Sequence, residues 1–218
     1  MVGRALLLDL DGTVADSLGV MRRIYGEFLA AHGTPASDRE FNDLNGPPLR
    51  EVVRRLQETH QISGDLDSLF ADYQRRIDTT YLQVLPRPGT RTLLETANSH
   101  GWKVAMVTSN SDHRTAAWLE ASDLADFFEV TICGEDIAHG KPHPEPYLLA
   151  LERTKCDAYL SLAVEDSFIG GRAAIAAGIS TFLLSDLCDR SPHGVLAITR
   201  LEEVTDYLLR EYQERGAR

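Results

Sequence analysis

The sequence predicts an α/β protein whose parallel sheet is interrupted, after its first strand, by an all-helical insert. Residues 5–8 form a Leu-rich run, the pattern of a central strand that is buried on both faces. Residues 18–85 place apolar side chains at helical spacing, with no convincing strand between them. From residue 90 onward helical and strand patterns alternate, which is typical of a parallel sheet covered by helices on both faces.

The elements follow in order along the chain. The insert contains three amphipathic segments, at residues 21–33, 49–60 and 66–85, and the stiff segment PRPG (residues 86–89) leads back to the sheet. Beyond it we expect helices at residues 90–99, 112–121, 144–153, 167–177 and 201–215, and strands at 103–108, 129–133, 160–165 and 180–184. The predicted domains are an α/β core, residues 1–16 and 87–218, and a helical domain, residues 17–86.

Composition and charge exclude several classes of function. The 218 residues are 43% hydrophobic, enough for a sizeable core, and carry a net charge of −11 without a basic block. A non-specific nucleic-acid surface is therefore not expected, because phosphate binding needs clustered positive charge. Cys133, Cys156 and Cys188 are widely spaced and form no CxxC pair, which fits a reduced, cytoplasmic setting. No apolar run reaches the length of a membrane span or a signal-peptide core.

Polar residues follow the predicted strands where each strand ends. The carboxyl ends of parallel strands meet at one edge of a sheet, so we expect these side chains to converge there. They are Asp9 and Asp11 at the end of the first strand, Thr108, Ser109 and Asn110 at the end of the second, Lys141 in a loop, and Glu165 and Asp166 at the end of a later strand.

Four of these residues, Asp9, Asp11, Glu165 and Asp166, are carboxylates that would repel one another without a compensating cation. Mg²⁺ prefers one or two carboxylates together with water and substrate phosphate oxygens, and Lys141 adds a positive charge. On an extended chain Asp9 and Asp11 would lie roughly 6 to 7 Å apart on the same side. One carboxylate could then attack phosphorus while the other protonates the leaving group.

Smaller groups nearby suit a phosphate. Gly12 permits close backbone approach to an anion, and the N–H groups that follow Asp9 could form a nest for phosphate oxygens. Thr108 could donate a hydroxyl hydrogen bond to the same group.

Four motifs, DLDGTVADS, VTSN, GKPHPEPY and VEDSFIGGRAAIAAG, stand in this order. Together they resemble the haloacid dehalogenase superfamily, in its capped phosphatase and phosphomutase branch, over essentially the whole chain. The resemblance implies a Rossmann-like core with a helical cap. It also implies a Mg²⁺-dependent phosphatase that hydrolyses a small phosphorylated metabolite, such as phosphoglycolate or a sugar phosphate, through an aspartyl-phosphate intermediate.

The resemblance also implies residue roles. Asp9 would be the nucleophile and Asp11 the general acid and then base, while Thr108 and Lys141 hold the phosphoryl group. Asp166 would bind Mg²⁺ with the Asp9 carboxylate and the Asp11 backbone carbonyl. Glu165 would either contact the metal directly or support the residues that do. Further substrate contacts are expected from Gly12, Ser109 and Asn110.

The predicted cap would read the rest of the substrate. Its loop NGPPLREVV, Asn45 to Val53, resembles the substrate-reading loop of this branch, so Arg50 and Arg54 are candidate anion contacts. The first cap helix would place four side chains at the entrance, those of Leu18, Met21, Arg22 and Tyr25.

Two other functions remain open. The β-phosphoglucomutases of this branch carry a histidine ten residues after the second aspartate and a lysine before the cap-loop glycine, where this chain has Met21 and Asn45. Both departures favour a phosphatase over a phosphomutase. A non-catalytic phosphate-binding module would have no use for the proton carried by Asp11, and the dehalogenases lack an aspartate at that position.

The remaining expectations concern residues outside this constellation. His139 and His143 are interpreted as surface residues rather than metal ligands, and Trp102 and Trp118 as core residues. We expect no membrane partner and either a monomer or a homodimer.

Overall fold

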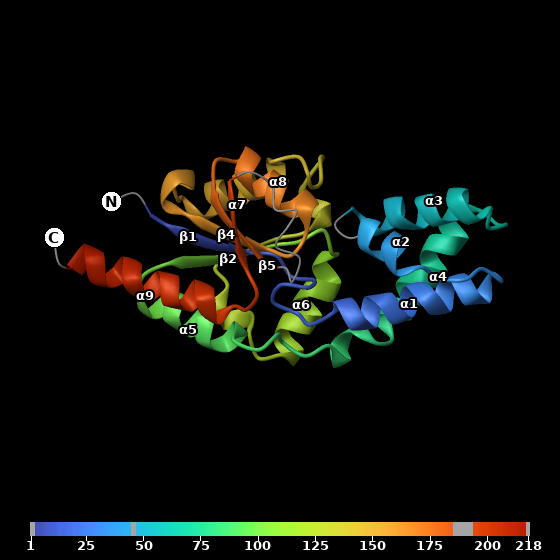
Figure 1. Ribbon diagram of the computed structural model, residues 1–218, viewed down its shortest axis with the longest axis horizontal. Coiled ribbons are helices and arrows are strands. Elements are labelled where there is room, and N and C mark those ends of the chain that lie inside the picture. Colours follow the sequence, from blue (N-terminus) through green and yellow to red (C-terminus); the bar gives the residue numbers. More distant parts are fainter. Residues whose placement is uncertain (1–2, 45–46, 185–193, 217–218) are drawn as a thin grey trace.

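The computed structural model describes residues 3–44, 47–184 and 194–216. Within these residues the strands form one parallel sheet in the order β3-β2-β1-β4-β5-β6 (Figure 1). The predicted fold class, α/β with a parallel sheet, is therefore confirmed. The strands are β1 (Ala5–Leu8), β2 (Lys103–Val107), β3 (Val130–Ile132), β4 (Leu162–Glu165), β5 (Ser180–Leu184) and β6 (Val195–Ile198).

Strand β1 lies at the centre of the sheet and is fully buried. Its residue Leu7 pairs with Ala105 of β2 on one side and with Ala163 of β4 on the other. Leu6 and Leu8 face one hydrophobic cluster, and Leu7 faces another. This two-sided burial explains why the strand sequence is a continuous apolar run.

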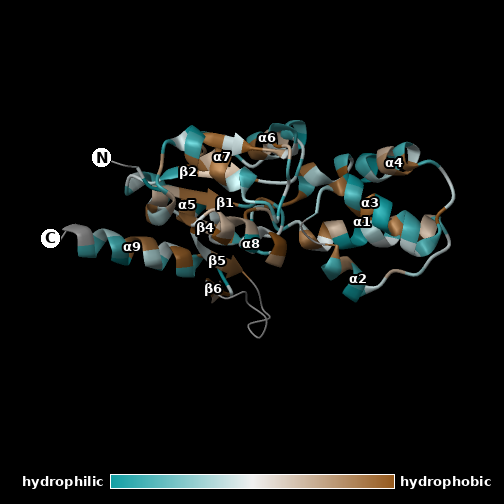
Figure 2. Cartoon of the chain, turned by 90° about the horizontal axis from the view of Figure 1, so that it is seen from above, coloured by the Kyte–Doolittle hydropathy of each residue, from teal (hydrophilic) through white to brown (hydrophobic). Residues whose placement is uncertain are grey.

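Helices cover both faces of the sheet (Figure 1). The cluster on one face contains side chains of α7 (Glu145–Thr154) and α8 (Phe168–Ala176). The cluster on the other face contains side chains of α5 (Thr90–Ser99), α6 (Asp112–Ala121) and α9 (Glu202–Gly216). Trp118 of α6 is fully buried there and donates its indole N–H to Val84 O at 2.8 Å, and Trp102 is also buried, as predicted for both. Figure 2 shows hydrophobic residues concentrated in the strands between these helix layers.

The segment between β1 and α5 is helical and lies beyond one end of the sheet (Figure 1). It contains α1 (Leu18–Ala31), α2 (Asp38–Asp43), α3 (Leu49–His60) and α4 (Leu66–Asp78), followed by the 3₁₀ turn η1 (Tyr81–Gln83). The chain leaves and returns along two adjacent segments. Asp16 N–H donates to Leu85 O at 2.9 Å, and Arg87 N–H donates to Val14 O at 2.8 Å. We call residues 17–86 the helical insert.

Several element bounds agree with the sequence prediction and others differ. Helices α3, α5 and α6 occupy the predicted ranges. The predicted helix at residues 66–85 ends at Asp78, because the hydroxyls of Thr79 and Thr80 donate to Arg76 O and offer an alternative to further helix. Helix α2 was not predicted, since it buries none of its residues and shows no apolar period. Strand β6 was also missed, because it lies at the sheet edge and is half exposed.

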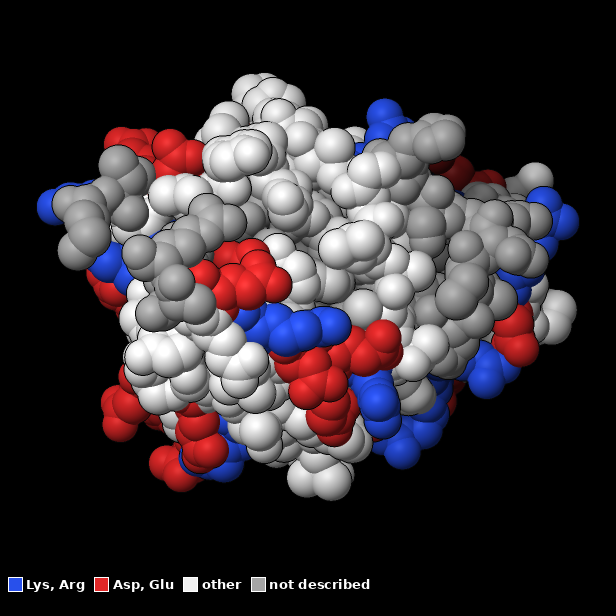
Figure 3. All heavy atoms as spheres, turned by 60° about the vertical axis from the view of Figure 1, so that its left-hand side comes forward, with Lys and Arg blue, Asp and Glu red and all other residues white. Residues whose placement is uncertain are grey.

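Other composition-based expectations can be compared with the described residues. Cys133 and Cys156 are free thiols, and Cys188 lies outside the described residues. No helix in the described ranges is long and apolar enough to cross a membrane. The face in Figure 3 carries acidic and basic side chains next to one another.

Candidate active site

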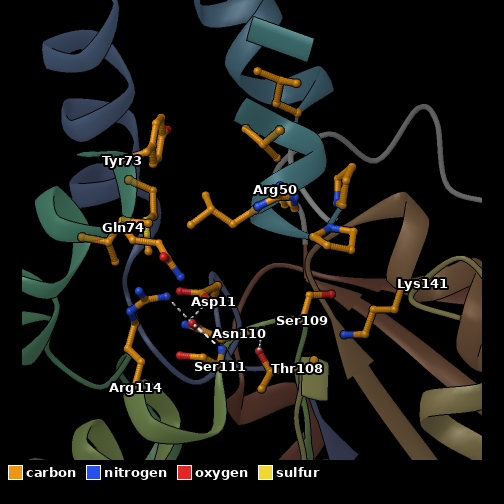
Figure 4. A pocket seen from close by; sticks show the side chains of 18 of the residues that line it. Asp11, Arg50, Tyr73, Gln74, Thr108, Ser109, Asn110, Ser111, Arg114 and Lys141 are labelled. Carbon is orange, nitrogen blue, oxygen red and sulfur yellow. Dashed lines mark hydrogen bonds between the residues drawn. The ribbon is translucent and has the colours of Figure 1, made fainter. Parts of the chain in front are cut away.

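A cavity of about 350 Å³ lies between the carboxyl edge of the sheet and the helical insert. Figure 4 shows side chains entering it from both parts of the molecule. The sheet side brings together most of the polar residues singled out in the sequence: Asp9, Asp11, Thr108, Ser109, Asn110, Lys141 and Asp166.

Lys141 lies at the centre of a buried charge cluster. Its Nζ donates to Asp9 Oδ1 at 2.6 Å, to Glu165 Oε1 at 2.5 Å and to Val107 O at 2.9 Å. Both carboxylates and the ammonium group are almost completely buried. Burial lowers the pKa of Lys141, but the two carboxylates raise it more, so that the pKa lies above its ordinary value. Lys141 is therefore a permanent cation beside the Asp9 carboxylate.

Glu165 is held by more than this ion pair. Its Oε1 also accepts from Tyr147 OH at 2.7 Å, and its Oε2 accepts from Ser167 Oγ at 3.2 Å. The carboxylate lies so close to Gly170 that a Cβ at this position would collide with it. Both oxygens of Glu165 are thus engaged within the protein, which suits a residue that orients Lys141.

Asp166 follows β4 and approaches the turn after β1. Gly12 has φ +82°, and a Cβ at Gly12 would collide with Asp166 Oδ2. Glycine is needed here both for the left-handed backbone and for the close approach of this carboxylate. The group that approaches the Gly12 backbone closely is therefore the Asp166 carboxylate, whereas the sequence analysis expected a phosphate anion there.

Asp9, Glu165 and Asp166 each offer a carboxylate oxygen, and these oxygens lie within 4.8 Å of one another. The pKa of Asp9 lies well above its ordinary value. Burial is the main cause, Lys141 opposes it by lowering the pKa, and the carboxylates of Glu165 and Asp166 raise the pKa further. One lysine does not balance three carboxylates. A hard cation with oxygen ligands, such as Mg²⁺, fits this donor set and would favour the ionised form of Asp9.

Asp11 lies beyond the extended strand. The expectation of an extended chain through Asp11 is wrong, because β1 ends at Leu8 and Leu10 O accepts the N–H groups of residues 13–15 in a turn. The carboxylate of Asp11 is outside the group of three that could share a metal ion. Instead its Oδ1 accepts from Tyr81 OH at 2.7 Å and its Oδ2 accepts from Asn110 Nδ2 at 3.1 Å.

The same turn removes part of the predicted phosphate nest. The N–H of Gly12 donates to Ala15 O at 3.0 Å and to Ser17 Oγ at 3.2 Å, and those of residues 13–15 are bonded to Leu10 O. The N–H groups of residues 12–15 therefore serve the turn, and the predicted substrate contact of Gly12 is not supported by this geometry. Thr108 is buried at the cavity, where its Oγ1 accepts from Asn110 N–H at 3.0 Å, and Ser109 lines the cavity beside it (Figure 4).

A chain of hydrogen bonds that the sequence analysis missed connects Asp11 to the insert. Arg114 Nη1 donates to Asn110 Oδ1 at 2.6 Å, and Arg114 Nη2 donates to Asp78 Oδ1, at the end of α4, at 2.6 Å. Asn110 precedes α6 by two residues and Arg114 lies in its first turn, so the two are four residues apart, a spacing that could have signalled contact. Asn110, predicted as a substrate contact, thus positions the Asp11 carboxylate (Figure 4).

The insert supplies the opposite wall of the cavity. Leu18, Met21 and Tyr25 line it, in agreement with the expected entrance, but Arg22 does not and pairs with Asp38. Arg50 lines the cavity and pairs with Asp67, while its guanidinium lies 5.3 Å from the ring centre of Phe70.

The prediction for Arg54 as an anion contact is wrong for this structure. Arg54 is outside the cavity lining and pairs with Glu51 and Glu58 on its own helix, α3. The i, i+3 and i, i+4 spacings of these glutamates explain the pairing. Asn45, at the start of the predicted substrate loop, lies outside the described residues.

His139 and His143 are exposed, as predicted for surface residues. Their rings lie 4.8 Å apart, and His139 Nδ1 lies 2.9 Å from Glu145 Oε2. Glu145 joins the two histidines in a group whose ligand atoms lie within 4.8 Å of one another. The Glu145 carboxylate is held by the N–H groups of Ala138 and His139, which explains its place beside the two rings.

Comparison with known proteins gives a consistent assignment. The family model for haloacid dehalogenase-like hydrolases matches residues 6–184. The chain is 29% identical over 210 residues to a phosphorylated carbohydrates phosphatase of Thermotoga maritima, covering 94% of this chain and 97% of that protein. It is 29% identical over 186 residues to a phosphoglycolate phosphatase of Nitrosospira multiformis, covering 82% of each.

A solved structure extends the agreement to three dimensions. The structure of CbbY from Rhodobacter sphaeroides in complex with phosphate superposes with a TM-score of 0.79 and 25% identity, covering 94% of this chain and 96% of that chain. The matched sequence range contains the Asp9, Thr108, Lys141 and Asp166 positions together with the whole insert. The chain belongs to the family of haloacid dehalogenase-like hydrolases.

Proposed function

We propose that the protein is a Mg²⁺-dependent phosphatase that hydrolyses a small organic phosphate monoester through an aspartyl-phosphate intermediate. One observation carries the proposal: the Asp9 carboxylate lies in the polar wall of the cavity, 2.6 Å from the Lys141 ammonium and within 4.8 Å of an Asp166 carboxylate oxygen. A nucleophile with positive charge beside it can approach a phosphate dianion. Relatives named as phosphatases of phosphorylated carbohydrates and of phosphoglycolate support the same reaction.

The reaction proceeds in two steps. An Asp9 carboxylate oxygen attacks phosphorus, the bond from phosphorus to the ester oxygen breaks, and Asp11 gives its proton to the departing oxygen. Asp11 then takes a proton from a water molecule whose oxygen attacks the aspartyl phosphate. The bond from phosphorus to Asp9 breaks, which releases inorganic phosphate and restores both aspartates. Tyr81 and Asn110 orient the Asp11 carboxylate for this exchange.

The phosphoryl oxygens are held by Thr108 and Lys141. The Asp9 and Asp166 carboxylates and the Asp11 backbone carbonyl would hold Mg²⁺, which supplies positive charge to the phosphoryl oxygens when bound. Glu165 supports this group through Lys141, because its two oxygens are already engaged with Lys141, Tyr147 and Ser167.

The helical insert, residues 17–86, acts as a cap over a core made of residues 1–16 and 87–218. Its helices line the cavity opposite the aspartates, and the two linker segments that join it to the sheet are adjacent. A cap in this place excludes water while Asp9 attacks and contacts the part of the substrate that leaves.

Release of inorganic phosphate from phosphoglycolate and several sugar phosphates, with Mg²⁺ or with EDTA, tests the proposal. We expect Mg²⁺-dependent phosphate release, and we expect Asp9→Asn to abolish it. Asp126→Asn, which removes an exposed carboxylate outside the cavity, should leave the rate unchanged. Mass spectrometry of the rapidly quenched enzyme should detect one added phosphoryl group in wild type and none in Asp9→Asn. Full activity of Asp9→Asn, or formation of an isomer in place of free phosphate, contradicts the proposal.

A further inference from the structure

The two walls of the active-site cavity differ in chemistry. The described core residues that line it are polar apart from Gly134, and they include the aspartates and Lys141. Of the described insert residues that line it, all except Arg50 and Gln74 are apolar or aromatic. Figure 4 shows Arg50, Tyr73 and Gln74 across the cavity from Asp11 and Asn110. The phosphoryl end of a substrate would meet the polar wall, and its leaving group would meet the apolar wall.

The apolar wall is not explained by packing within the insert alone. Phe28 and Leu56 are completely buried inside the insert. Met21, Leu49 and Phe70 line the cavity and are only half buried, so part of their apolar surface is in contact with the cavity. Apolar surface in a concave site favours a ligand that covers it, because covering removes this surface from water.

The two arginines at this wall each have a carboxylate partner. Arg50 pairs with Asp67, and Arg114, at the boundary of the two walls, pairs with Asp78. A leaving group with a carboxylate would therefore meet two arginines whose charges are balanced. A leaving group with several hydroxyls would lose hydrogen bonds to water without finding partners among apolar side chains. These properties disfavour phosphoglycolate and sugar phosphates as the best substrates.

Aromatic side chains give the wall a further preference. Four aromatic residues line the cavity, Tyr25, Phe41, Phe70 and Tyr73, and the ring centres of Tyr25 and Phe41 lie 5.7 Å apart. Such rings favour offset or edge-to-face contact with another ring. The Arg50 guanidinium over Phe70 extends this surface, since a guanidinium also stacks on rings.

We infer that the leaving group carries an aromatic ring, so that the substrates are monophosphate esters of aromatic or heteroaromatic alcohols. This inference rests on the proposed phosphatase function and names its substrate class. The ring would lie against Phe70 and Leu49, with the Gln74 amide available to a polar atom at the ring edge. A cavity of about 350 Å³ lies in the range of sites for small organic ligands.

Esters of matched reactivity provide the first test. Benzyl phosphate, cyclohexylmethyl phosphate and glycerol phosphate are all esters of primary alcohols, and phosphoglycolate is added for comparison. We expect kcat/KM for benzyl phosphate to exceed that for glycerol phosphate and phosphoglycolate by about 30-fold or more, because each buried methylene-sized increment contributes about fourfold. Benzyl phosphate should also exceed cyclohexylmethyl phosphate. Equal or reversed ratios overturn the inference.

A substitution in the wall provides the second test. Phe70→Leu keeps the position apolar and removes the ring, and it should lower kcat/KM for benzyl phosphate at least fivefold more than for glycerol phosphate. Tyr159→Leu is the matched control, because Tyr159 is 87% exposed and lies outside the cavity lining. The control should leave the substrate ratio unchanged. Equal losses for both esters in Phe70→Leu count against aromatic contact at this wall.

Binding separates this inference from the proposed function. Calorimetry with wild-type protein and Mg²⁺ compares benzylphosphonate with phosphonoacetate, neither of which is hydrolysed. Tighter binding of benzylphosphonate by about 30-fold upholds the aromatic class even if no ester is hydrolysed. In that case the proposed phosphatase reaction is wrong, and the inferred ligand class stands. Equal or weaker binding overturns the aromatic class, even if phosphoglycolate is hydrolysed and the phosphatase function stands.

Discussion

Replacing Lys141 by methionine removes the cation from the buried cluster and keeps most of the aliphatic side chain. In wild type the Nζ group contacts Asp9, Glu165 and the carbonyl of Val107 at 2.5 to 2.9 Å. The variant leaves both carboxylates buried next to Asp166 without the lysine. We therefore expect a large loss of stability as well as loss of activity.

The magnitude follows from the burial of the pair. Breaking a buried ion pair by removing one partner costs about 3–5 kcal/mol, because the remaining charge stays buried. A domain of this size changes its Tm by about 2–4 °C for each kcal/mol, so Lys141→Met should lower Tm by about 6–20 °C. Methionine fills the volume of the lysine chain, which keeps any cavity contribution small.

The loss should depend on pH with a definite sign. The pKa of Lys141 in the folded state lies above its ordinary value, so its stabilisation is fully present below the ordinary lysine pKa, including pH 5 to 8. In the variant, Asp9 loses the charge that lowers its pKa, and its already raised pKa rises further. A carboxyl whose folded pKa is raised destabilises the fold as pH increases through that pKa. The deficit of Lys141→Met should therefore be larger at pH 8 than at pH 5.

Urea unfolding in EDTA at both pH values measures this deficit. The matched control is Lys103→Met, because Lys103 also pairs with a glutamate, Glu129, at 2.7 Å, but with both side chains well exposed to solvent. Exposed pairs contribute little, so the control should change stability less and show little pH dependence. A Lys141→Met deficit no larger than that of Lys103→Met, or one equal at pH 5 and pH 8, would refute the reasoning.

Three further predictions concern metal binding, pH and the general acid. Mg²⁺ at 100 times its Kd should stabilise wild type by about 2.7 kcal/mol, a Tm increase of about 5–11 °C by scanning fluorimetry. Asp166→Asn should show no such increase in Tm. A Tm increase equal to that of wild type contradicts the assignment of Asp166 as a metal ligand. Burial raises the pKa of Asp9, so kcat/KM should fall on acidification at a pH above the ordinary aspartate pKa. Because Mg²⁺ favours the carboxylate, the midpoint of this acidic fall in kcat/KM should move to lower pH as the Mg²⁺ concentration increases. A midpoint that does not move excludes competition between the proton and the metal. Tyr81→Phe removes the hydrogen bond to Asp11 and should lower kcat about 10- to 100-fold with little change in KM. The control Tyr212→Phe, at an exposed tyrosine, should leave kcat unchanged. Equal kcat in the two variants rules out that Tyr81 orients the general acid.

The polar wall of the cavity could be predicted because short chain segments position it. Asp9, Thr108 and Asp166 each follow the end of a strand by one residue, and the register pairs Leu8 with Met106 and with Val164. Parallel pairing in this register brings the strand ends to one edge, wherever the rest of the chain goes. Local sequence was therefore enough to bring these three side chains together.

The support of Asp11 could not be predicted in the same way. Tyr81 is 70 residues from Asp11 in the sequence and lies in a 3₁₀ turn, within a stretch whose apolar period extends the preceding helix. Arg114 reaches Asp78 across 36 residues. Both contacts depend on how the linker returns from the insert to the sheet, and the local pattern carries no information about that path.

The apolar wall of the cavity shows a second limit of the sequence. Leu56 and Phe70 are both apolar residues at helical spacing in the insert, yet Leu56 is completely buried inside the insert and Phe70 lines the cavity. A core and an apolar binding site favour the same residue types, so periodicity does not separate them. Their difference arises when the helices pack and leave one apolar surface next to the aspartates. The substrate class therefore depends on side chains outside the four motifs, and a change at Phe70 or Leu49 can alter the preferred ester while Asp9, Asp11 and Lys141 stay the same.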